Sequence, residues 1–227
     1  MDRQNGFEGN KMASGRLITF EGPEGAGKST QAALLISKLE ARGIEVVYTR
    51  EPGGTKLGEA IRGILQYNAA GEDPCPESEV LLFEASRAQL VRHVIQPALE
   101  RGAWVLCDRF ADSTTAYQGF GRGFSVELME TINRFAIGAA VPDMTILLDV
   151  NVSLGMQRCA KRQIGKKVQH DRIESEALEF HEKVRQGYLD LARRFPERFR
   201  KVDAMRLAEP IAEDVWKLVS DAFLAQG

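Results

Sequence analysis

The stretch FEGPEGAGKST, Phe20–Thr30, decides the fold of this 227-residue chain. Within it, Gly22 to Ser29 fills the pattern G-x-x-x-x-G-K-[ST] in full. The apolar run Leu17–Phe20 precedes the motif, and a helical pattern from Lys28 to Arg42 follows it. A glycine-rich turn between a strand and a helix is the setting in which backbone N–H groups bind phosphate. The stretch therefore predicts a nucleoside triphosphate site rather than an ordinary glycine turn.

The residue types in this loop suit the groups of a triphosphate. The glycines let the backbone approach phosphate oxygens, and Lys28 is expected to reach the β- and γ-phosphates. The Ser29 hydroxyl is expected to ligate Mg²⁺. The expected ATP phosphate-binding residues are Gly22, Gly25, Ala26, Gly27, Lys28, Ser29 and Thr30. Motor ATPases, GTPases, transporters and small-molecule kinases all carry such a loop, so the loop alone does not name a reaction.

Composition and charge narrow the class of protein. The net charge of −2 gives no basic field for duplex nucleic acid, so no nucleic-acid partner is expected. Three widely spaced cysteines form no zinc or disulfide motif, which favours a reducing, cytoplasmic setting. Apolar runs are too short to span a bilayer, so no membrane partner is expected either. We interpret residues 1–15 as a flexible extension and residues 16–227 as one domain.

Short apolar runs alternate with helical patterns along the chain. The expected strands are 17–20, 44–49, 104–107, 144–150 and 199–202. The expected helices are 28–42, 56–67, 78–99, 126–137, 174–194 and 211–224. This alternation predicts an α/β fold in which a parallel sheet is covered by helices on both faces. Ligands of such sheets gather at the carboxyl ends of the strands, so the residues after each strand are the candidates.

Charged residues follow the third expected strand in the triplet Asp108–Phe110 (DRF). Asp108 would stand beside the phosphate loop, where a carboxylate can hold the water shell of Mg²⁺. Asp149, after the fourth strand, is a rival for this role, and a capping or salt-bridging role is the alternative for Asp108. The guanidinium of Arg109 suits a bidentate grip on an acceptor phosphate.

Phe83 and Arg87 lie four residues apart on one expected helix and so share a face. Such a pair can stack a pyrimidine on the ring and donate from the guanidinium to a carbonyl oxygen. Thymine offers an O4 acceptor where cytosine presents an amino donor, so an arginine here favours thymine. The alternative for Phe83 is a place in the core, which is the more common position of an aromatic residue on a helix.

Several motifs in register resemble thymidylate kinases. Thr49–Thr55 (TREPGGT), Leu81–Leu90 (LLFEASRAQL) and DRF followed by Ser113–Gly123 (STTAYQGFGRG) match that family in order, and the resemblance runs from Arg16 to about Ala225. It implies a P-loop nucleoside monophosphate kinase fold with a five-stranded parallel sheet, transfer of the ATP γ-phosphoryl group to dTMP giving dTDP, and a homodimer. The dTMP-binding residues that it implies are Glu24, Glu51, Pro52, Arg62, Phe83, Arg87, Arg109, Ser113, Thr114, Tyr117 and Gln118.

Three of these positions carry specific expectations. Glu24 is a negative charge inside a loop that binds a polyanion, and the resemblance directs it to the 3′-hydroxyl of the acceptor. Arg62 resembles a second arginine on the acceptor phosphate, with a solvent-facing helix charge as the alternative. Arg50 and Glu51 are alternatively expected to brace each other and shape the loop.

The densest basic run, residues 158–172, is expected to form a lid. Phosphoryl transfer needs stabilisation of spreading negative charge more than a strong base. In the family that the sequence resembles, the catalytic arginine comes from the phosphate loop or from the lid. Residues 23–26 contain no arginine, so the resemblance assigns the role to Arg158, Arg162 or Arg172, with Arg162 as the first choice. The alternative is a solvated face or a weak nucleic-acid patch. Glu174 resembles the end of a family D-R-x-E element that orders the metal or the lid.

The expected catalytic residues are thus Lys28, Arg109, Arg162 and Glu24, and the expected metal-binding residues are Ser29, Asp108 and Glu174. Two rival functions stay open. One is a kinase of another nucleotide or of a nucleoside, for which Glu24 would be the candidate base. The other is a non-catalytic nucleotide-binding switch that uses the lid as a partner surface.

Overall fold

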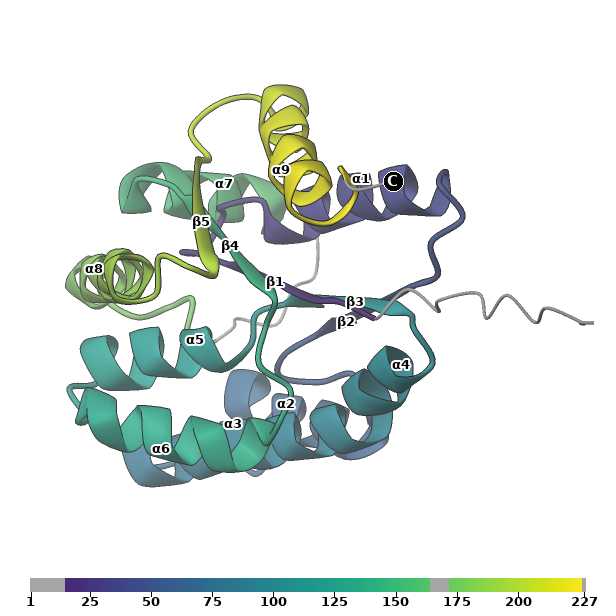
Figure 1. Ribbon diagram of the computed structural model, residues 1–227. Helices are drawn as coiled ribbons and strands as arrows, with labels where there is room; N and C mark the ends of the chain where they lie inside the picture. Colours follow the sequence, from purple (N-terminus) through teal and green to yellow (C-terminus); the bar gives the residue numbers. More distant parts are fainter. Residues whose placement is uncertain (1–14, 164–171, 226–227) are drawn as a thin grey trace, which may run out of the picture.

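The computed structural model of the protein describes residues 15–163 and 172–225. Its strands form one parallel sheet in the order β2-β3-β1-β4-β5, which confirms the predicted fold class (Figure 1). The strands are β1 (Leu17–Glu21), β2 (Val46–Arg50), β3 (Trp104–Asp108), β4 (Met144–Asp149) and β5 (Phe199–Asp203). Of the expected extension, residues 1–14 lie outside the described residues. Gly15 packs so closely on the backbone of Leu99 and Ala103 that a side chain there would clash.

Helices cover the sheet, most of the expected ones near their predicted bounds, whereas the helices over 111–114 and 152–163 were not among those expected. The helices are α1 (Lys28–Glu40), α2 (Lys56–Tyr67), α3 (Pro76–Leu90), α4 (Gln96–Glu100), α5 (Ala111–Thr114), α6 (Val126–Ile137), α7 (Val152–Gln163), α8 (Leu178–Arg194) and α9 (Ala208–Phe223), with π-helical turns η1 (Val91–Ile95) and η2 (Thr115–Gly121). In the described ranges, none of these helices is both long enough and apolar enough to span a membrane.

Two sequence-based bounds differ from the structure. The single helix expected over 78–99 is α3, η1 and α4 in succession, so its hydrogen-bond pattern changes partway. The helix expected from Glu174 begins at Leu178. The preceding residues are held elsewhere, because the backbone N–H of Arg172 donates to the carbonyl of Gln66 at 3.1 Å. A contact with a distant helix thus overrides the local helical pattern.

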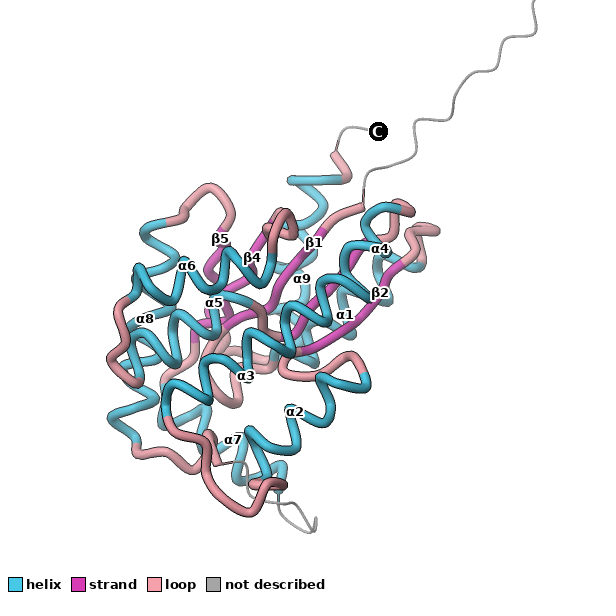
Figure 2. Tube along the Cα trace, turned by 90° about the horizontal axis from the view of Figure 1, so that it is seen from below, coloured by secondary structure: helices cyan, strands magenta, loops and turns pink. Residues whose placement is uncertain are grey.

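Side chains of the sheet alternate between two apolar layers. Ile18 and Phe20 of β1 pack with residues of α1 and α9, whereas Leu17 packs with residues of α3, η1 and α4. Figure 1 shows α1 and α9 on one side of the strands, and Figure 2 looks onto the other side, where α3 and α6 cross in front of them. Burying a side chain such as Phe20 stabilises the fold by roughly 1.5–3 kcal/mol.

The strand order brings the sequence motifs to one edge. β1 lies between β3 and β4, and Phe20 of β1 pairs in register with Asp108 of β3. The phosphate loop and the DRF turn therefore leave the sheet side by side. Parallel strands with this order present their ligand-binding crevice at the carboxyl ends.

Two glycines let the phosphate loop rest on the first turns of α7. Gly25 has a φ of +68°, and a Cβ at this position would lie 2.1 Å from the carbonyl oxygen of Gly155. In return, a Cβ on Gly155 would lie 2.2 Å from the carbonyl oxygen of Glu24. Because both obstacles are backbone atoms, a side chain at either position would force the loop away from α7.

We expect Gly155→Ala to destabilise the protein by about 1–3 kcal/mol, because the added methyl overpacks the contact between α7 and the phosphate loop. Gly63→Ala in α2 is the matched control, since its nearest neighbour would be Ala69 Cβ at an ordinary 3.6 Å. That control should stabilise the helix by up to about 1 kcal/mol. Urea unfolding curves of the two variants measure both values, and equal stability of the two would contradict the close approach.

Candidate active site

A cavity of about 570 Å³ lies at the predicted edge of the sheet. The phosphate loop, the DRF turn and the end of α7 line it together. A second cavity of about 40 Å³ adjoins it and shares Glu24, Gln66 and Arg109 with it. The two cavities, one wide and one narrow, therefore share part of their lining.

Lys28, the first residue of α1, is held inside the phosphate loop. Its Nζ donates to the carbonyl oxygens of Gly22 at 3.0 Å and Pro23 at 2.9 Å. Burial lowers the pKa of Lys28, and the nearby Arg109 charge lowers it further, while carboxylates including Glu24 oppose the shift. The loop thus presents a preorganised cation. Gly25, Ala26, Gly27, Ser29 and Thr30 line the wide cavity around it.

The expected metal-binding oxygens lie in the same wide cavity. Ser29 and Asp108 both line it, and Asp108 also accepts a hydrogen bond from the Tyr48 hydroxyl at 3.4 Å. The rival Asp149 is engaged elsewhere, because Arg185 donates to both of its carboxylate oxygens, at 2.8 and 3.3 Å. A hydroxyl and a carboxylate are the oxygen ligands that Mg²⁺ prefers, so the donor set fits this ion.

Arg109 connects the DRF turn to the phosphate loop. Its backbone φ of +69° lies in the left-handed region, which is uncommon for a residue with a side chain. The guanidinium pairs with Glu24 at 2.5 Å and donates to the Gly22 carbonyl at 3.2 Å. The same guanidinium lies over the ring of Tyr117, 5.0 Å from its centroid. Arg109 therefore stands where the two cavities meet.

Glu24 is ionised despite its burial. Burial by itself would raise the pKa of this carboxyl, but the charges of Arg109 and Lys28 and a 2.8 Å hydrogen bond from Tyr117 lower it to about 2. A general base works best when its pKa is near the working pH. This property counts against Glu24 as the base of a nucleoside kinase.

Glu21, at the end of β1, holds residues of the site in place, and the sequence analysis did not identify it. Its carboxylate accepts from the backbone N–H of Phe110 at 2.7 Å, from Ser113 Oγ at 2.7 Å and from the Tyr188 hydroxyl at 2.9 Å. Tyr188 also accepts from Arg109 at 3.2 Å. Burial, and next the charge of Asp112, raise the pKa of Glu21 to about 7. The sequence did offer one indication, because Glu21 ends the first strand and directly precedes the phosphate loop.

The narrow cavity brings together most of the side chains expected to bind the acceptor. Pro52, Phe83, Ser113, Thr114, Tyr117 and Gln118 all line it, joined by Gln66 and Ile173. Arg62 and Glu51 line the wide cavity instead, and Arg62 donates to the Pro52 carbonyl at 3.0 Å. The narrow cavity has room for a few water molecules.

Arg87 lies directly behind the lining of the narrow cavity. It is 1% exposed and is absent from the described residues that line the two cavities. Its guanidinium donates to Glu51, Glu84, Asn133, Thr114 and the Phe110 carbonyl. Arg87 thus lies behind the cavity and contacts its lining through Thr114 Oγ1, at 3.0 Å, and its direct donation to a base stays a prediction.

Arg50 and Glu51 do not brace each other. Arg50 pairs with Glu59 at 3.0 Å, while Glu51 pairs with Arg87 at 2.7 Å. Burial raises the pKa of Glu51 to about 7 against the opposing charge of Arg87, and the neighbouring Glu84 adds to the rise. The partner of Arg50 lies nine residues away, whereas the partner of Glu51 lies 36 residues away, on α3.

The basic segment divides into two parts. Arg158 and Arg162 lie on α7 and line the wide cavity, and Arg162 is 56% exposed while it pairs with Glu174 at 3.1 Å. Arg158 donates to the Ala204 carbonyl at 2.8 Å. Arg172 pairs with Glu79 on α3 and is not among the described residues that line either cavity, and its lid role stays a prediction. Residues 164–171 of the expected lid lie outside the described residues.

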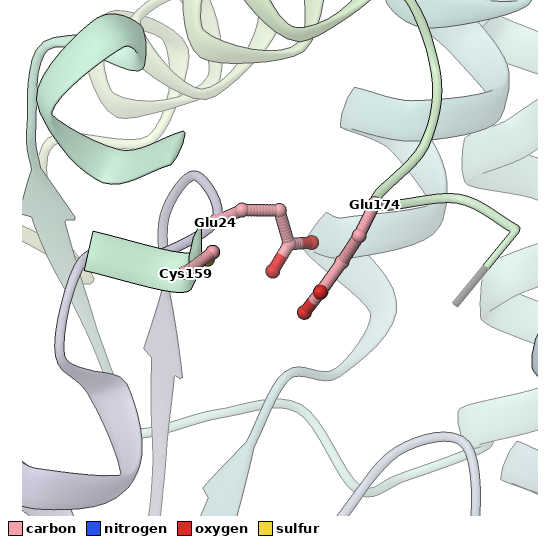
Figure 3. A group of neighbouring side chains, drawn as sticks. All are labelled: Glu24, Cys159 and Glu174. Atoms are coloured by element: carbon pink, nitrogen blue, oxygen red, sulfur yellow. The ribbon is translucent and has the colours of Figure 1, made fainter. Parts of the chain in front are cut away.

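Glu24, Cys159 and Glu174 converge beside the phosphate loop (Figure 3). One ligand atom from each lies within 4.8 Å of the others, and Figure 3 shows the two carboxylates directed into the same space. Burial raises the pKa of Cys159 to about 11, so its sulfur stays a neutral thiol. The metal role expected of Glu174 stays a prediction.

Sequence reasoning also missed part of the wide cavity. Residues that follow β5 line its far side, namely Arg206, Leu207, Ala208 and Ile211. The fifth strand was predicted, and the rule that ligands gather after strands would have indicated this segment. It was missed because the segment carries no recognisable motif.

Comparisons with known proteins agree with this geometry. The family model described as thymidylate kinase matches residues 20–215. A thymidylate kinase of Deinococcus radiodurans is 50% identical over 210 residues, covering 92% of this chain and 98% of the relative. One of Pelotomaculum thermopropionicum is 50% identical over 213 residues, covering 92% and 96%. The crystal structure of thymidylate kinase from Ehrlichia chaffeensis has a TM-score of 0.71 and 34% identity, covering 91% of this chain and 99% of that one.

We expect Glu21→Gln to flatten the pH dependence of stability. The folded-state pKa of Glu21, about 7, lies above its ordinary value of 4.5, so folding favours the protonated form. The stabilising contribution is therefore present below about pH 4.5 and is lost as the pH rises through 7. Relative to the variant, the parent should lose up to about 3 kcal/mol between pH 4.5 and 7.5.

Urea unfolding at several pH values measures this difference. Glu72→Gln, an exposed change in the loop before α3, is the control and should follow the parent curve. Parallel curves for Glu21→Gln and the parent would contradict the raised pKa.

Proposed function

This chain belongs to the thymidylate kinase family, and from that premise we propose how its residues divide the reaction. It is a phosphotransferase that moves the γ-phosphoryl group of ATP to dTMP, giving ADP and dTDP for dTTP synthesis. The observation that carries the residue assignment is the 2.5 Å ion pair between Glu24 and Arg109. It joins the loop that suits ATP phosphates to the cavity that suits the acceptor.

The donor phosphates bind in the loop from Gly22 to Thr30. Backbone N–H groups of Gly25, Ala26 and Gly27, together with the N-terminus of α1, donate to their oxygens. Lys28 exchanges its hydrogen bonds to loop carbonyls for charge-assisted bonds to the β- and γ-phosphates, which are stronger. Ser29 and Asp108 would hold Mg²⁺, and Glu174 would add a carboxylate close by. Once bound, this ion neutralises charge on the β- and γ-phosphates.

The acceptor lies across the junction of the two cavities. Arg109 and Arg62 grip its phosphate, and Glu24 accepts a hydrogen bond from its 3′-hydroxyl. Tyr117 packs against the 2′ position of the sugar, where it disfavours a ribose hydroxyl. The base enters the narrow cavity beside Phe83, with Thr114 and Gln118 at its polar edge, and Glu51, Pro52 and Ser113 shape the surrounding walls.

Transfer proceeds by direct attack of an acceptor phosphate oxygen on the γ-phosphorus. The bond from the γ-phosphorus to the β,γ-bridging oxygen breaks, and the electron pair leaves with ADP. The attacking oxygen is already anionic, so no strong base is required. Lys28, Arg109 and Arg162 stabilise the charge that spreads over the transferring group. Arg162 suits this role because its exposed guanidinium lines the wide cavity and can leave Glu174.

We further propose that the enzyme works as a homodimer in the cytoplasm. Cys75, Cys107 and Cys159 are all free, as is usual in a reducing compartment. On α6, Leu128 and Phe135 are 48% and 89% exposed, and their spacing of seven residues places them on one face. Large exposed apolar side chains that gather on one face are typical of protein interfaces.

The activity is tested by following ADP release with ATP, Mg²⁺ and each of dTMP, dUMP, dCMP, UMP and thymidine. We expect the highest kcat/KM with dTMP and loss of turnover when EDTA removes the metal. Arg109→Lys should lower kcat/KM for dTMP at least about 100-fold, because lysine cannot form the bidentate phosphate contact. Arg101→Lys is the control, since Arg101 is half exposed and pairs with Glu45 on the surface.

ATP binding without turnover of any acceptor would contradict the kinase function and favour a nucleotide-dependent switch. Equal activity of Arg109→Lys and Arg101→Lys would instead leave the reaction in place and overturn the role given to Arg109.

The dimer is tested by light scattering after size exclusion. Phe135→Asp should shift the protein toward half the parent mass, because a charge buried in an apolar interface is costly. Leu178→Asp, at the 54% exposed first residue of α8, is the control and should keep the parent mass. A parent that is itself monomeric would contradict the proposal directly.

A further inference from the structure

Glu79 on α3 is a buried carboxylate that the proposed reaction does not use. It is 1% exposed and accepts hydrogen bonds on both oxygens. Gln118 and Arg122 donate to Oε1 at 2.9 and 3.2 Å, while Arg122 and Arg172 donate to Oε2. Three residues that are distant from α3 in sequence thus converge on one acidic group.

The partners of Glu79 keep it ionised. Burial would raise its pKa, but the hydrogen bonds from Arg122, Arg172 and Gln118 bring it below the ordinary value. An ionised carboxylate has acceptors and no donor. Any group that hydrogen-bonds to it must therefore present an N–H or O–H.

This requirement fixes the amide of Gln118. Its two ends differ only in being a donor, Nε2, and an acceptor, Oε1, and the carboxylate of Glu79 selects Nε2. The carbonyl oxygen Oε1 is then the end left for another partner. Across the described residues, no hydrogen bond to Oε1 is found, and Gln118 lines the narrow cavity beside Phe83 and Thr114.

A carbonyl oxygen in that cavity distinguishes pyrimidine bases by the atom at ring position 3. Thymine carries N3–H, a donor that Oε1 can accept, whereas neutral cytosine carries an unprotonated N3 that would repel it. Without a fixed orientation the amide could turn its NH₂ group to cytosine, and the discrimination would be lost. Leaving a buried polar atom unpaired costs more than a hydrogen bond gains, so orientation controls specificity.

We propose that Glu79 is a positioning residue for base specificity, which holds Gln118 so that its carbonyl oxygen receives thymine N3–H and rejects cytosine N3. This inference rests on the proposed placement of the base in the narrow cavity. It assigns to α3 a part in reading a base that Glu79 itself does not touch. Arg122 and Arg172 supply the positive charge that makes an ionised carboxylate tolerable in this buried position.

The test measures the ratio of kcat/KM for dTMP to kcat/KM for dCMP. Glu79→Gln keeps the shape of the side chain but can donate as well as accept, so Gln118 becomes free to turn. We expect the ratio to fall roughly tenfold, mainly through KM. Glu77→Gln is the matched control, since it makes the same change at an exposed residue in the first turn of α3 and should leave the ratio unchanged.

A double-mutant cycle separates positioning from general damage. If Glu79 acts through Gln118, Glu79→Gln should not lower the ratio further in a Gln118→Ala background. An unchanged ratio in Glu79→Gln, an equal fall in Glu77→Gln, or an additive fall in the double variant would each overturn the inference. If the parent does not phosphorylate dTMP, the proposed function fails before any variant is compared.

The unmutated enzyme gives a second measurement should Glu79→Gln not fold. In 3-methyl-dTMP a methyl group replaces the N3 hydrogen, so the contact with Gln118 Oε1 is lost. We expect kcat/KM to be at least tenfold lower than for dTMP, and the two substrates to approach each other in Gln118→Ala. Equal kcat/KM for both substrates in the parent would overturn the inference.

Discussion

The ion pair between Glu24 and Arg109 is the interaction on which the rest of the site depends. It ties the phosphate loop after β1 to the turn after β3, two segments that neighbouring parallel strands deliver to the same edge. A phosphate loop with an internal carboxylate would repel its ligand if that charge were unpaired. Arg109 neutralises it and at the same time presents donors at the junction of the two cavities. One pair thereby lets a single loop serve both the donor and the acceptor.

Buried side chains next to the site hold the two residues of this ion pair in place through hydrogen bonds. Glu21 holds the backbone of Phe110 and the hydroxyls of Ser113 and Tyr188, so the left-handed turn at Arg109 is fixed from below. Arg87 plays a similar part for Thr114 by means of a guanidinium shared between Glu51 and Glu84. Removing one partner of a buried ion pair typically costs about 3–5 kcal/mol. Such networks therefore make the site rigid, but they stabilise it only when complete.

Some residues of the active site are held rigidly and others can move, depending on which part of the fold carries them. Residues at the ends of β1 and β3 are held by the sheet and by buried partners. Arg162, by contrast, extends from the last turns of α7 with an exposed guanidinium. Charge stabilisation can thus be brought to the transferring group, while the loop and the acceptor grip stay fixed. This arrangement is consistent with a reaction in which positioning and electrostatics matter more than acid–base chemistry.

The phosphate loop, the five strands and most of the residues around the narrow cavity could be predicted from the sequence. These features have local causes: glycine spacing, apolar runs between helical patterns, and motifs that directly follow strands. The features that the sequence did not reveal have a different origin. The spacing of Phe83 and Arg87 places both on one side of a helix, but it does not reveal that two glutamates and an asparagine bind the Arg87 guanidinium.

Glu21, Glu79 and Tyr188 escaped prediction for the same reason, because each derives its role from partners far away in the chain. The sequence by itself determined the fold class, the phosphate-binding loop and the edge of the sheet at which chemistry occurs. Only the tertiary structure decided which charges pair, which side chains reach the cavities and which hold them from behind. A hydrogen bond or ion pair depends on distances of a few ångströms between distant segments, and such distances exist only once the chain has folded.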